Sequence, residues 1–208
     1  MPTNDALAVY RRKRDFSRTT EPTGSKADRV SDEPTFVVQI HDASTLHFDF
    51  RLEVDGVLKS WAVPKGPSDD PHDKRLAMPT EDHPMEYADF EGVIAEGEYG
   101  AGTVIVWDEG TYRSLATDRH GREIPFDQAL EAGHASFRLH GRKLHGAYAL
   151  TRIRRGGQRE AWLLVKHDDA RTSHHGTPHP SRARSAHTGR TLGQVSAQER
   201  TGGKDERG

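Results

Sequence analysis

The chain of 208 residues contains no cysteine, so it has neither a disulfide nor a thiolate for catalysis or metal binding. This composition fits a reducing cytosol, and we expect a cytoplasmic protein. Long hydrophobic runs are also missing: no apolar stretch reaches membrane-spanning length, and the first residues lack the apolar core of a signal peptide. Hydrophobic residues make up only 33% of the chain, below the usual share for a globular domain. Either the core is lean or part of the chain is disordered.

The charge of the chain is nearly balanced, with a formal net charge of −2 at pH 7. This balance alone does not indicate a nucleic-acid partner. Cations nevertheless gather near the N-terminus, at Arg11, Arg12, Lys13, Arg14 and Arg18. A basic cluster of this kind either binds an anionic partner or forms a solvated face, and the solvated face is favoured for Arg11 and Arg12.

Apolar residues nearly vanish from residue 171 to the end of the chain. The segment 171–198 carries four arginines and no acidic residue. Such a segment cannot bury enough apolar surface to offset the entropy lost on ordering, so the sequence predicts a disordered basic tail over residues 171–208. A flexible His-rich tract is a better interpretation than a metal site for its histidines, which are His174, His175, His179 and His187.

Short strand-like runs separated by turn residues dominate the middle of the chain. This pattern, with turn signals such as Asp55-Gly56, favours an antiparallel barrel or sandwich. A barrel is preferred because a polar cavity can face its inside while the apolar face packs outside. The expected strands are 35–40, 46–54, 57–63, 103–107, 135–139, 146–153 and 161–167.

The chain therefore divides into an arm, a barrel domain and a tail. The arm covers residues 1–34 with a short helix over 6–14, and the barrel domain covers 35–170 with a helix over 126–132. The tail covers residues 171–208. The predicted fold class is mainly β: a small antiparallel β-barrel with a polar, metal-containing cavity, short flanking helices and a disordered C-terminal tail.

The segment 46–54 alternates without interruption between apolar and polar residues. In an extended strand this places His47, Asp49 and Arg51 on one face, and His41 ends the preceding apolar run. Two histidines and an aspartate suffice to bind a divalent metal, and an arginine beside them suits phosphate. The polar face of a half-buried strand is usually just solvated, so the local pattern leaves both interpretations open.

Other polar residues lie on turns and loops. Lys65 follows a strand on a Pro-Lys-Gly turn and Arg75 lies in a charged loop, where most side chains are solvated. Glu81 and His83 lie in a Glu-Asp-His-Pro segment, and the following proline favours an extended conformation that we expect to project the His83 ring outward. His83 could be a general acid, an anion donor or a plain surface histidine. The glycine-rich segment 90–102 lacks the GK[ST] of a P-loop and predicts tight turns instead.

Together these residues describe a divalent metal held by histidine and aspartate, with arginine, lysine and another histidine around it. Such a set suits phosphoryl chemistry, because negative charge spreads over oxygen atoms in the transition state. The stretches QIHDASTLHFDFRLE, SWAVPKGPS and KRLAMPTEDHPMEYADFEGVIAEGEYGAGTVIVWDEGTY closely resemble the 3′-phosphoesterase domain of bacterial ATP-dependent DNA ligase D. YRRKRDFSRTTEP and RSAHTGRTL are also similar to that family. The resemblance covers roughly residues 9–167 and the tail motif.

The resemblance implies a small β-barrel and a manganese-dependent repair of DNA 3′ ends. Other divalent cations are alternatives to manganese as the cofactor. A phosphodiesterase step would remove a terminal ribonucleoside from a primer strand, and a phosphomonoesterase step would then remove the 3′-phosphate. It also implies a role in double-strand break repair by non-homologous end joining, in a prokaryotic cytoplasm and nucleoid. The partners implied are DNA 3′ ends and the DNA ligase, polymerase and Ku of end joining, without a membrane.

The resemblance also implies roles for individual residues. The residues that match the metal ligands are His41, His47 and Asp49. The residues that match the catalytic set are His83 and Arg51 at the scissile phosphate, with Tyr87, Glu81 and Asp15. The residues that match further phosphate or DNA contacts are Lys65, Arg75 and Arg14, besides Arg51 itself, and Glu21 belongs to the same N-terminal contribution.

Three other classes of protein share parts of this pattern. A covalent DNA ligase needs a lysine two residues before an Asp-Gly pair. In this chain Glu53 occupies that position before Asp55-Gly56, which argues against adenylation there. A non-catalytic module that binds DNA ends or a ligase partner would keep the barrel, but the complete ligand set argues against lost chemistry. A cupin-like enzyme for small molecules would have a compatible His and carboxylate set, but the surrounding arginine and lysine favour phosphate.

Overall fold

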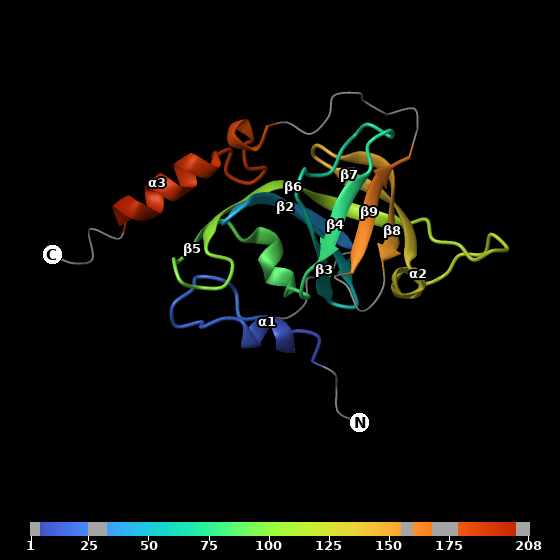
Figure 1. The fold of residues 1–208 in the computed structure, drawn as a ribbon, viewed down its shortest axis with the longest axis horizontal. Helices are drawn as coiled ribbons and strands as arrows, with labels where there is room; N and C mark the ends of the chain where they lie inside the picture. The colour runs from blue at the N-terminus through green and yellow to red at the C-terminus, as the bar shows by residue number, and fades with distance from the viewer. Residues whose placement is uncertain (1–4, 25–32, 155–159, 168–178, 203–208) are drawn as a thin grey trace.

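The computed structural model describes residues 5–24, 33–154, 160–167 and 179–202 (Figure 1). Its strands are β1 (Thr35–Asp42), β2 (Leu46–Val54), β3 (Val57–Val63), β4 (Arg75–Pro79), β5 (Gly92–Ile94), β6 (Gly102–Ser114), β7 (His134–Gly141), β8 (His145–Arg154) and β9 (Ala161–Lys166). Its helices are α1 (Ala8–Arg12), the 3₁₀ helix η1 (Met85–Asp89), α2 (Phe126–Ala132), the 3₁₀ helix η2 (Pro180–Arg182) and α3 (Leu192–Gly202).

Eight of the strands close into an antiparallel barrel. The hydrogen-bonded order is β1-β2-β3-β4-β9-β8-β7-β6, and a further pairing of β1 with β6 completes the ring. The short strand β5 lies outside the ring, attached to β6. The predicted antiparallel β-barrel is therefore confirmed, and the sandwich alternative is excluded.

The β2–β3 hairpin positions the residues singled out in the sequence. Its two-residue loop is Asp55-Gly56, with φ values of 51° and 76°, and Val54 pairs with Val57 on either side. Positive φ at both loop positions is the geometry that a tight hairpin requires, and Asp-Gly is among the pairs that adopt it most readily. The turn fixes the register, and the register decides which side chains of β2 share a face.

The interior of the barrel is apolar. Every strand of the ring contributes to one buried cluster, which includes Phe36 of β1 and Phe50 of β2 and their counterparts across the barrel, such as Phe137 and Leu164. The expectation of a polar cavity inside the barrel is therefore wrong. The apolar residues of β2 point inward, because a barrel of this size fills its interior with side chains, and the polar face of β2 lies on the outside.

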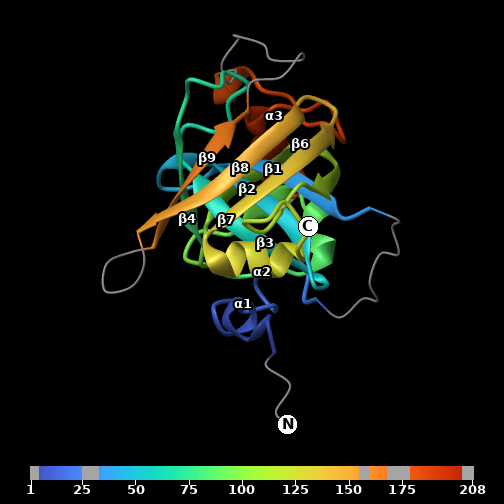
Figure 2. The same ribbon diagram turned by 90° about the vertical axis from the view of Figure 1, so that its right-hand side faces the viewer.

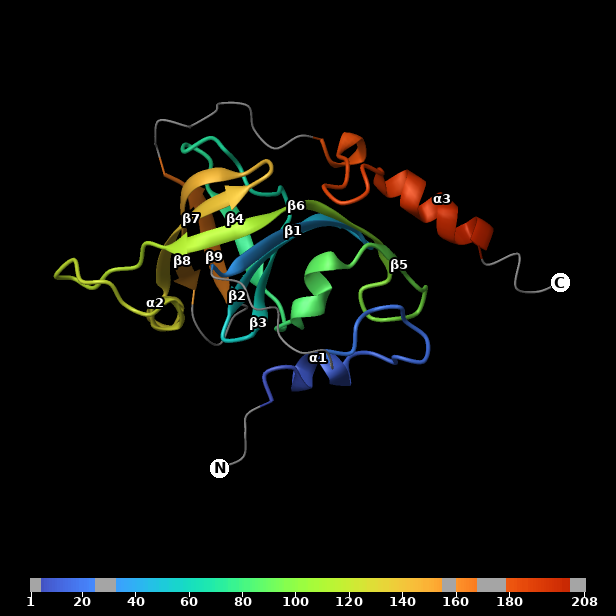
Figure 3. The same ribbon diagram turned by 180° about the vertical axis from the view of Figure 1, so that it is seen from behind.

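The N-terminal arm and η1 cover this outer polar face. A second buried cluster joins Tyr10 of α1 and Tyr87 of η1 to Val37 of β1 and Val106 of β6. Figures 1 and 3 show η1 between the barrel wall and α1. The polar residues of β1 and β2 are therefore enclosed between the barrel wall and this cover, not within the barrel.

The prediction of a disordered tail is wrong for residues 179–202. These residues form η2 and α3, and Val195 is only 1% exposed in the main core cluster. Thr191 and Gln194 form a reciprocal capping box. The backbone N–H of Gln194 donates to Thr191 Oγ1 (3.3 Å), and the backbone N–H of Thr191 donates to Gln194 Oε1 (2.9 Å). Few apolar residues suffice here, because they pack on an existing barrel core and not on one another.

Figures 1 and 2 show α1 and α3 on opposite sides of the barrel.

The observed strands include two that the sequence did not predict. These are β4 and β5, which are both short, and β5 has only three residues. His174 and His175 lie outside the described residues. No helix in the described part of the chain is long and apolar enough to cross a membrane.

Candidate metal centre

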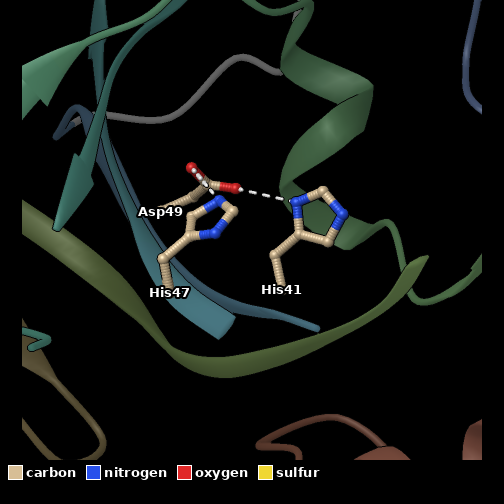
Figure 4. A group of neighbouring side chains, drawn as sticks. All are labelled: His41, His47 and Asp49. Atoms are coloured by element: carbon tan, nitrogen blue, oxygen red, sulfur yellow. Dashed lines mark ion pairs between the residues drawn. The ribbon is translucent and has the colours of Figure 1, made fainter. Parts of the chain in front are cut away.

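Three of the predicted side chains converge on one point outside the barrel wall (Figure 4). His41 of β1 pairs with His47 of β2, and Asp49 follows two residues later on the same face. Asp49 lies 3.7 Å from His41, measured from Oδ2 to Nδ1, and 3.7 Å from His47, measured from Oδ1 to Nε2. One donor atom from each residue falls within 4.8 Å of the others. The structure therefore brings together the ligand set that the strand alternation indicated.

Backbone carbonyls orient both imidazole rings. His41 Nε2 donates to the carbonyl of Gly100 (2.7 Å), and His47 Nδ1 donates to the carbonyl of Thr45 (2.8 Å). In a neutral ring that carries its proton on that nitrogen, the nitrogen facing Asp49 has a lone pair for a metal. Metal-binding histidines are commonly fixed by an outer hydrogen bond of this kind. The two nitrogens and the carboxylate therefore fit a divalent ion, although this mixed donor set does not select one metal.

Asp49 is ionised and ready to act as a ligand. Its burial alone would raise the pKa, but the Arg51 guanidinium beside it and the two histidines outweigh burial and hold the pKa well below the usual range. Arg51 Nη2 donates to Asp49 Oδ2 over 3.1 Å. The same guanidinium therefore keeps Asp49 charged and stands beside the position that a metal would take.

Arg51 is held in a fixed orientation, with only 2% of its surface exposed. Its Nε donates to Gln39 Oε1 (2.8 Å), and its Nη1 donates to Ser60 Oγ (2.8 Å). Gln39 is anchored in turn, because its amide donates to the carbonyls of Tyr87 and Phe90 in and after η1. Gln39 and Ser60 were missed in the sequence. Strand parity could have revealed them: Gln39 shares a face with His41, and Ser60 pairs with Arg51 across β2 and β3.

His83 is buried, not projecting, with 4% of its surface exposed. The prediction of an outward ring fails because the loop pairs with β3 through reciprocal backbone hydrogen bonds between Leu58 and His83 (2.8 and 3.0 Å). The ring lies between two arginines: Nδ1 is 3.0 Å from Arg51 Nη1, and Nε2 is 3.4 Å from Arg14 Nη2. Burial, and then the charges of Arg51 and Arg14, lower the His83 pKa well below 6.5. Without a bound anion His83 is therefore neutral at pH 7.

The N-terminal arm adds a charged network to the site. Arg14 donates to Glu21 Oε1 (2.9 Å) and Glu81 Oε1 (3.1 Å), and Lys13 donates to Glu81 Oε2 (3.0 Å). Burial opposes ionisation of Glu81, but hydrogen bonds from its own backbone, Lys13 and Arg14 outweigh burial and lower its pKa. The Tyr87 hydroxyl donates to Glu21 over 2.9 Å. The arm is therefore tied to the barrel by paired, largely buried charges.

These groups surround one pocket of about 250 Å³. Because Arg14 and Arg51 point into the same space as the candidate ligands, an anion bound beside a metal would meet fixed guanidinium groups. The lining includes the predicted residues His41, His47, Asp49, Arg51, His83, Glu81, Tyr87 and Arg14.

Three predicted site residues do not line this pocket. Lys65 and Arg75 lie together at a separate depression with Lys74, where Arg75 Nη1 donates to the Lys65 carbonyl (3.4 Å) and Nη2 to Asp73 (2.6 Å). Asp15 is exposed, and its carboxylate accepts hydrogen bonds from the Ser17 hydroxyl and amide. The phosphate or DNA contacts of Lys65 and Arg75 and the catalytic role of Asp15 therefore stay predictions for residues outside the pocket.

Comparison with known proteins finds a matching protein family and several relatives of this chain. Residues 39–152 match the DNA Ligase D 3′-phosphoesterase domain family. The chain is 54% identical over 170 residues to the Multifunctional non-homologous end joining protein LigD of Pseudomonas aeruginosa, which covers 81% of this chain and 19% of that protein. The LigD proteins of Mycobacterium tuberculosis and Mycolicibacterium smegmatis are 49% and 43% identical and cover 78% and 72% of this chain. The chain spans about a fifth of the length of these relatives, 20% and 19% for the latter two.

Fold and site together define a class: a closed antiparallel β-barrel whose outer wall has a pocket lined by a candidate metal-ligand set and two guanidinium groups. Within that class the chain belongs to the DNA ligase D 3′-phosphoesterase domain family. The family expected from the sequence motifs is thereby confirmed.

Proposed function

We propose that this protein is a metal-dependent phosphoesterase that repairs DNA 3′ ends during non-homologous end joining. Its phosphodiesterase step removes a terminal ribonucleoside and leaves a 3′-phosphate, and its phosphomonoesterase step removes that phosphate. The observation that carries the proposal is the convergence of the His41, His47 and Asp49 donor atoms with the buried guanidinium of Arg51 in one pocket.

His41, His47 and Asp49 would hold the ion, and we propose Mn²⁺ with other divalent ions as substitutes. The bound ion would supply Lewis-acid stabilisation of charge on the phosphoryl oxygens. The protein itself supplies the orientation, because Gly100 and Thr45 fix the two imidazole rings. It also supplies Asp49, whose lowered pKa leaves the carboxylate ionised at neutral pH.

Arg51 binds the substrate phosphate in this proposal. Asp49 accepts from one of the two N–H groups on Nη2, so the other can donate to a phosphate oxygen. Because Gln39 and Ser60 already hold the guanidinium, little side-chain entropy is lost when the phosphate binds. Arg14 approaches the same space from the N-terminal arm and stabilises a second oxygen.

His83 serves as a transition-state donor or as the acid for the leaving oxygen. Its ring is neutral without substrate, since burial and two arginines oppose a proton. A bound phosphate dianion adds negative charge beside the ring and favours protonation. The phosphate therefore recruits its own proton donor.

The test uses the purified protein on 5′-labelled primer–templates whose primer ends in one ribonucleotide, in a deoxynucleotide or in a 3′-phosphate. Each is incubated with EDTA, Mn²⁺, Mg²⁺ or Zn²⁺. We expect the ribonucleotide end to pass through a 3′-phosphate to a 3′-hydroxyl, only with metal. Binding of all three ends without cleavage under any metal would instead support the alternative, a non-catalytic DNA-end module of a ligase complex.

The proposal also includes the protein partners with which this protein acts at broken DNA ends. The names of the relatives place them in non-homologous end joining, so DNA ligase, polymerase and Ku are the proposed partners of this protein at broken ends in the bacterial cytoplasm. Joining of a ribonucleotide-ended break by a purified ligase, with and without this protein, measures the link. A yield that does not change would contradict it.

A further inference from the structure

A second groove lies directly beside the pocket that holds the candidate ligands. Its volume is about 520 Å³, about twice that of the first pocket. The two share Thr80, Glu81 and Tyr99 as common walls, so they form one continuous surface. The groove is lined by Val9, Lys13, Met78, Pro79, Thr80, Glu81, Tyr99 and Glu160.

Tyr99 is unusual among the aromatic residues of the described chain. Its side chain is 47% exposed, whereas the others are buried or half-buried. It lies in the turn between β5 and β6, immediately before Gly100, whose carbonyl orients the candidate ligand His41. The exposed Tyr99 ring therefore lies one residue before the carbonyl that orients a candidate metal ligand.

Cations hold the Tyr99 ring in place. Lys13 Nζ donates to the Tyr99 hydroxyl (3.0 Å) and lies 4.4 Å from the ring centroid, and the Arg14 guanidinium carbon lies 5.6 Å from it. The neighbouring acidic groups are already paired: Glu81 accepts from Lys13 and Arg14, and Glu160 accepts from Trp162 Nε1 (2.7 Å). The groove therefore offers an aromatic ring, apolar walls and one cation, Lys13, to an incoming group.

We propose that this groove holds the base of the nucleotide that carries the 3′-phosphate, stacked on Tyr99. The inference rests on the proposed function, because it needs the phosphate in the adjoining pocket. A nucleobase is flat and apolar on its faces, and aromatic side chains bind such faces in single-stranded nucleic acid. Lys13 donates to Glu81 and Tyr99, two residues that line both pockets, and would meet the backbone of the strand between base and phosphate.

This assignment predicts a particular specificity. Stacking accepts every base, since every base has a π face, so the enzyme should process ends of any sequence. It should discriminate strongly against an end whose last nucleotide has no base. The groove would thus recognise the presence of a nucleotide without reading its identity.

The test measures binding of an oligonucleotide with a 3′-phosphate and 2-aminopurine as its last base, in EDTA so that no hydrolysis occurs. Fluorescence of 2-aminopurine falls when the base stacks. We expect quenching with the wild type and Tyr99→Phe, and roughly tenfold weaker binding with Tyr99→Leu. For an oligonucleotide with an abasic last position, read by anisotropy, Tyr99→Leu should bind as the wild type does.

The control is Ile153→Ala, because Ile153 is also an exposed apolar side chain but lies on β8, outside both pockets. It should leave binding unchanged. Thermal melting of each variant shows whether the turn that orients His41 is intact. Equal binding by Tyr99→Leu and the wild type, or the same loss on the abasic end, would overturn the groove assignment alone. A wild type that does not bind the 3′-phosphate end in EDTA would overturn the groove assignment alone. If it also released no phosphate from that end with Mn²⁺, the proposed function would fail with it.

Discussion

Arg51 donates a hydrogen bond to Asp49 over 3.1 Å from two positions further along the same strand. One group is a candidate metal ligand and the other a candidate phosphate donor, and both come from the same face of β2. The two are also linked electrostatically, because Arg51 lowers the pKa of Asp49. A change at Arg51 should therefore affect both phosphate binding and the metal centre.

Replacing Arg51 by lysine should reduce turnover on 3′-phosphate ends by about 100-fold, the scale of losing one preorganised donor to a developing charge. Lysine cannot reproduce the planar contact that reaches Gln39, Ser60 and Asp49 at once. The measurement is kcat from phosphate release, with thermal melting to confirm folding. Arg113→Lys, on the exposed outer part of β6, is the matched control and should be silent. Normal turnover in Arg51→Lys would show that guanidinium geometry is unimportant.

His83→Ala should retain the fold and the bound metal but lose about 100-fold or more in rate, the usual scale for a general acid or base. Calorimetric titration with Mn²⁺ separates metal binding from rate. If His83 protonates the leaving oxygen, the loss should shrink on a substrate with a good leaving group. If it stabilises charge, the loss should persist. A folded variant with normal rate would rule out both roles.

Burial of His83 should also affect stability at acidic pH in the metal-free protein. The folded-state pKa lies well below 6.5, while the unfolded ring titrates near 6.5. Between these two pKa values His83 is protonated in the unfolded state and neutral in the folded state. Its contribution to the free energy of unfolding is therefore complete above pH 6.5 and is lost as the pH falls below 6.5, by up to about 1.4 kcal/mol per pH unit. Urea unfolding from pH 7.5 to 5 in EDTA, compared with His83→Gln, measures this. Parallel curves for the two proteins would contradict the assignment.

The C-terminal segment should stabilise the barrel. Leu192→Ala should reduce the free energy of unfolding by about 2–4 kcal/mol, because Leu192 is buried against the main core. A chain ending at residue 178 should lose more, while a chain ending at Gly202 retains α3 and serves as the control. Thermal melting compares them. If the protein ending at 178 melts like the full chain, the packing of α3 contributes nothing.

Much of the site could be predicted from β2. The uninterrupted alternation and the Asp55-Gly56 turn together fix which residues share a face, and the pairing of His41 with His47 then follows from the β1–β2 hairpin. The sequence could not show which face of the barrel would be covered. That depends on Tyr10 and η1, which reach the polar face from distant parts of the chain.

The errors have definite physical causes. The tail was judged by its average composition, yet the Thr191 and Gln194 capping box and two apolar residues one turn apart were enough to dock a helix on an existing core. The role of Asp15 rests on motif alone and stays a prediction, with its carboxylate accepting a hydrogen bond from Ser17 in a local turn. Gln39 was overlooked because its neighbours on the strand are apolar.

The most direct test of the account is a crystal grown with Mn²⁺ and an oligonucleotide whose 3′-phosphate is replaced by a non-hydrolysable methylenephosphonate, measured near the manganese absorption edge. We predict an anomalous peak about 2.0–2.3 Å from His41 Nδ1, His47 Nε2 and an Asp49 oxygen, at usual ligand distances, with the phosphonate between the ion and Arg51. No peak at these atoms, or a phosphonate bound away from Arg51, would contradict the account.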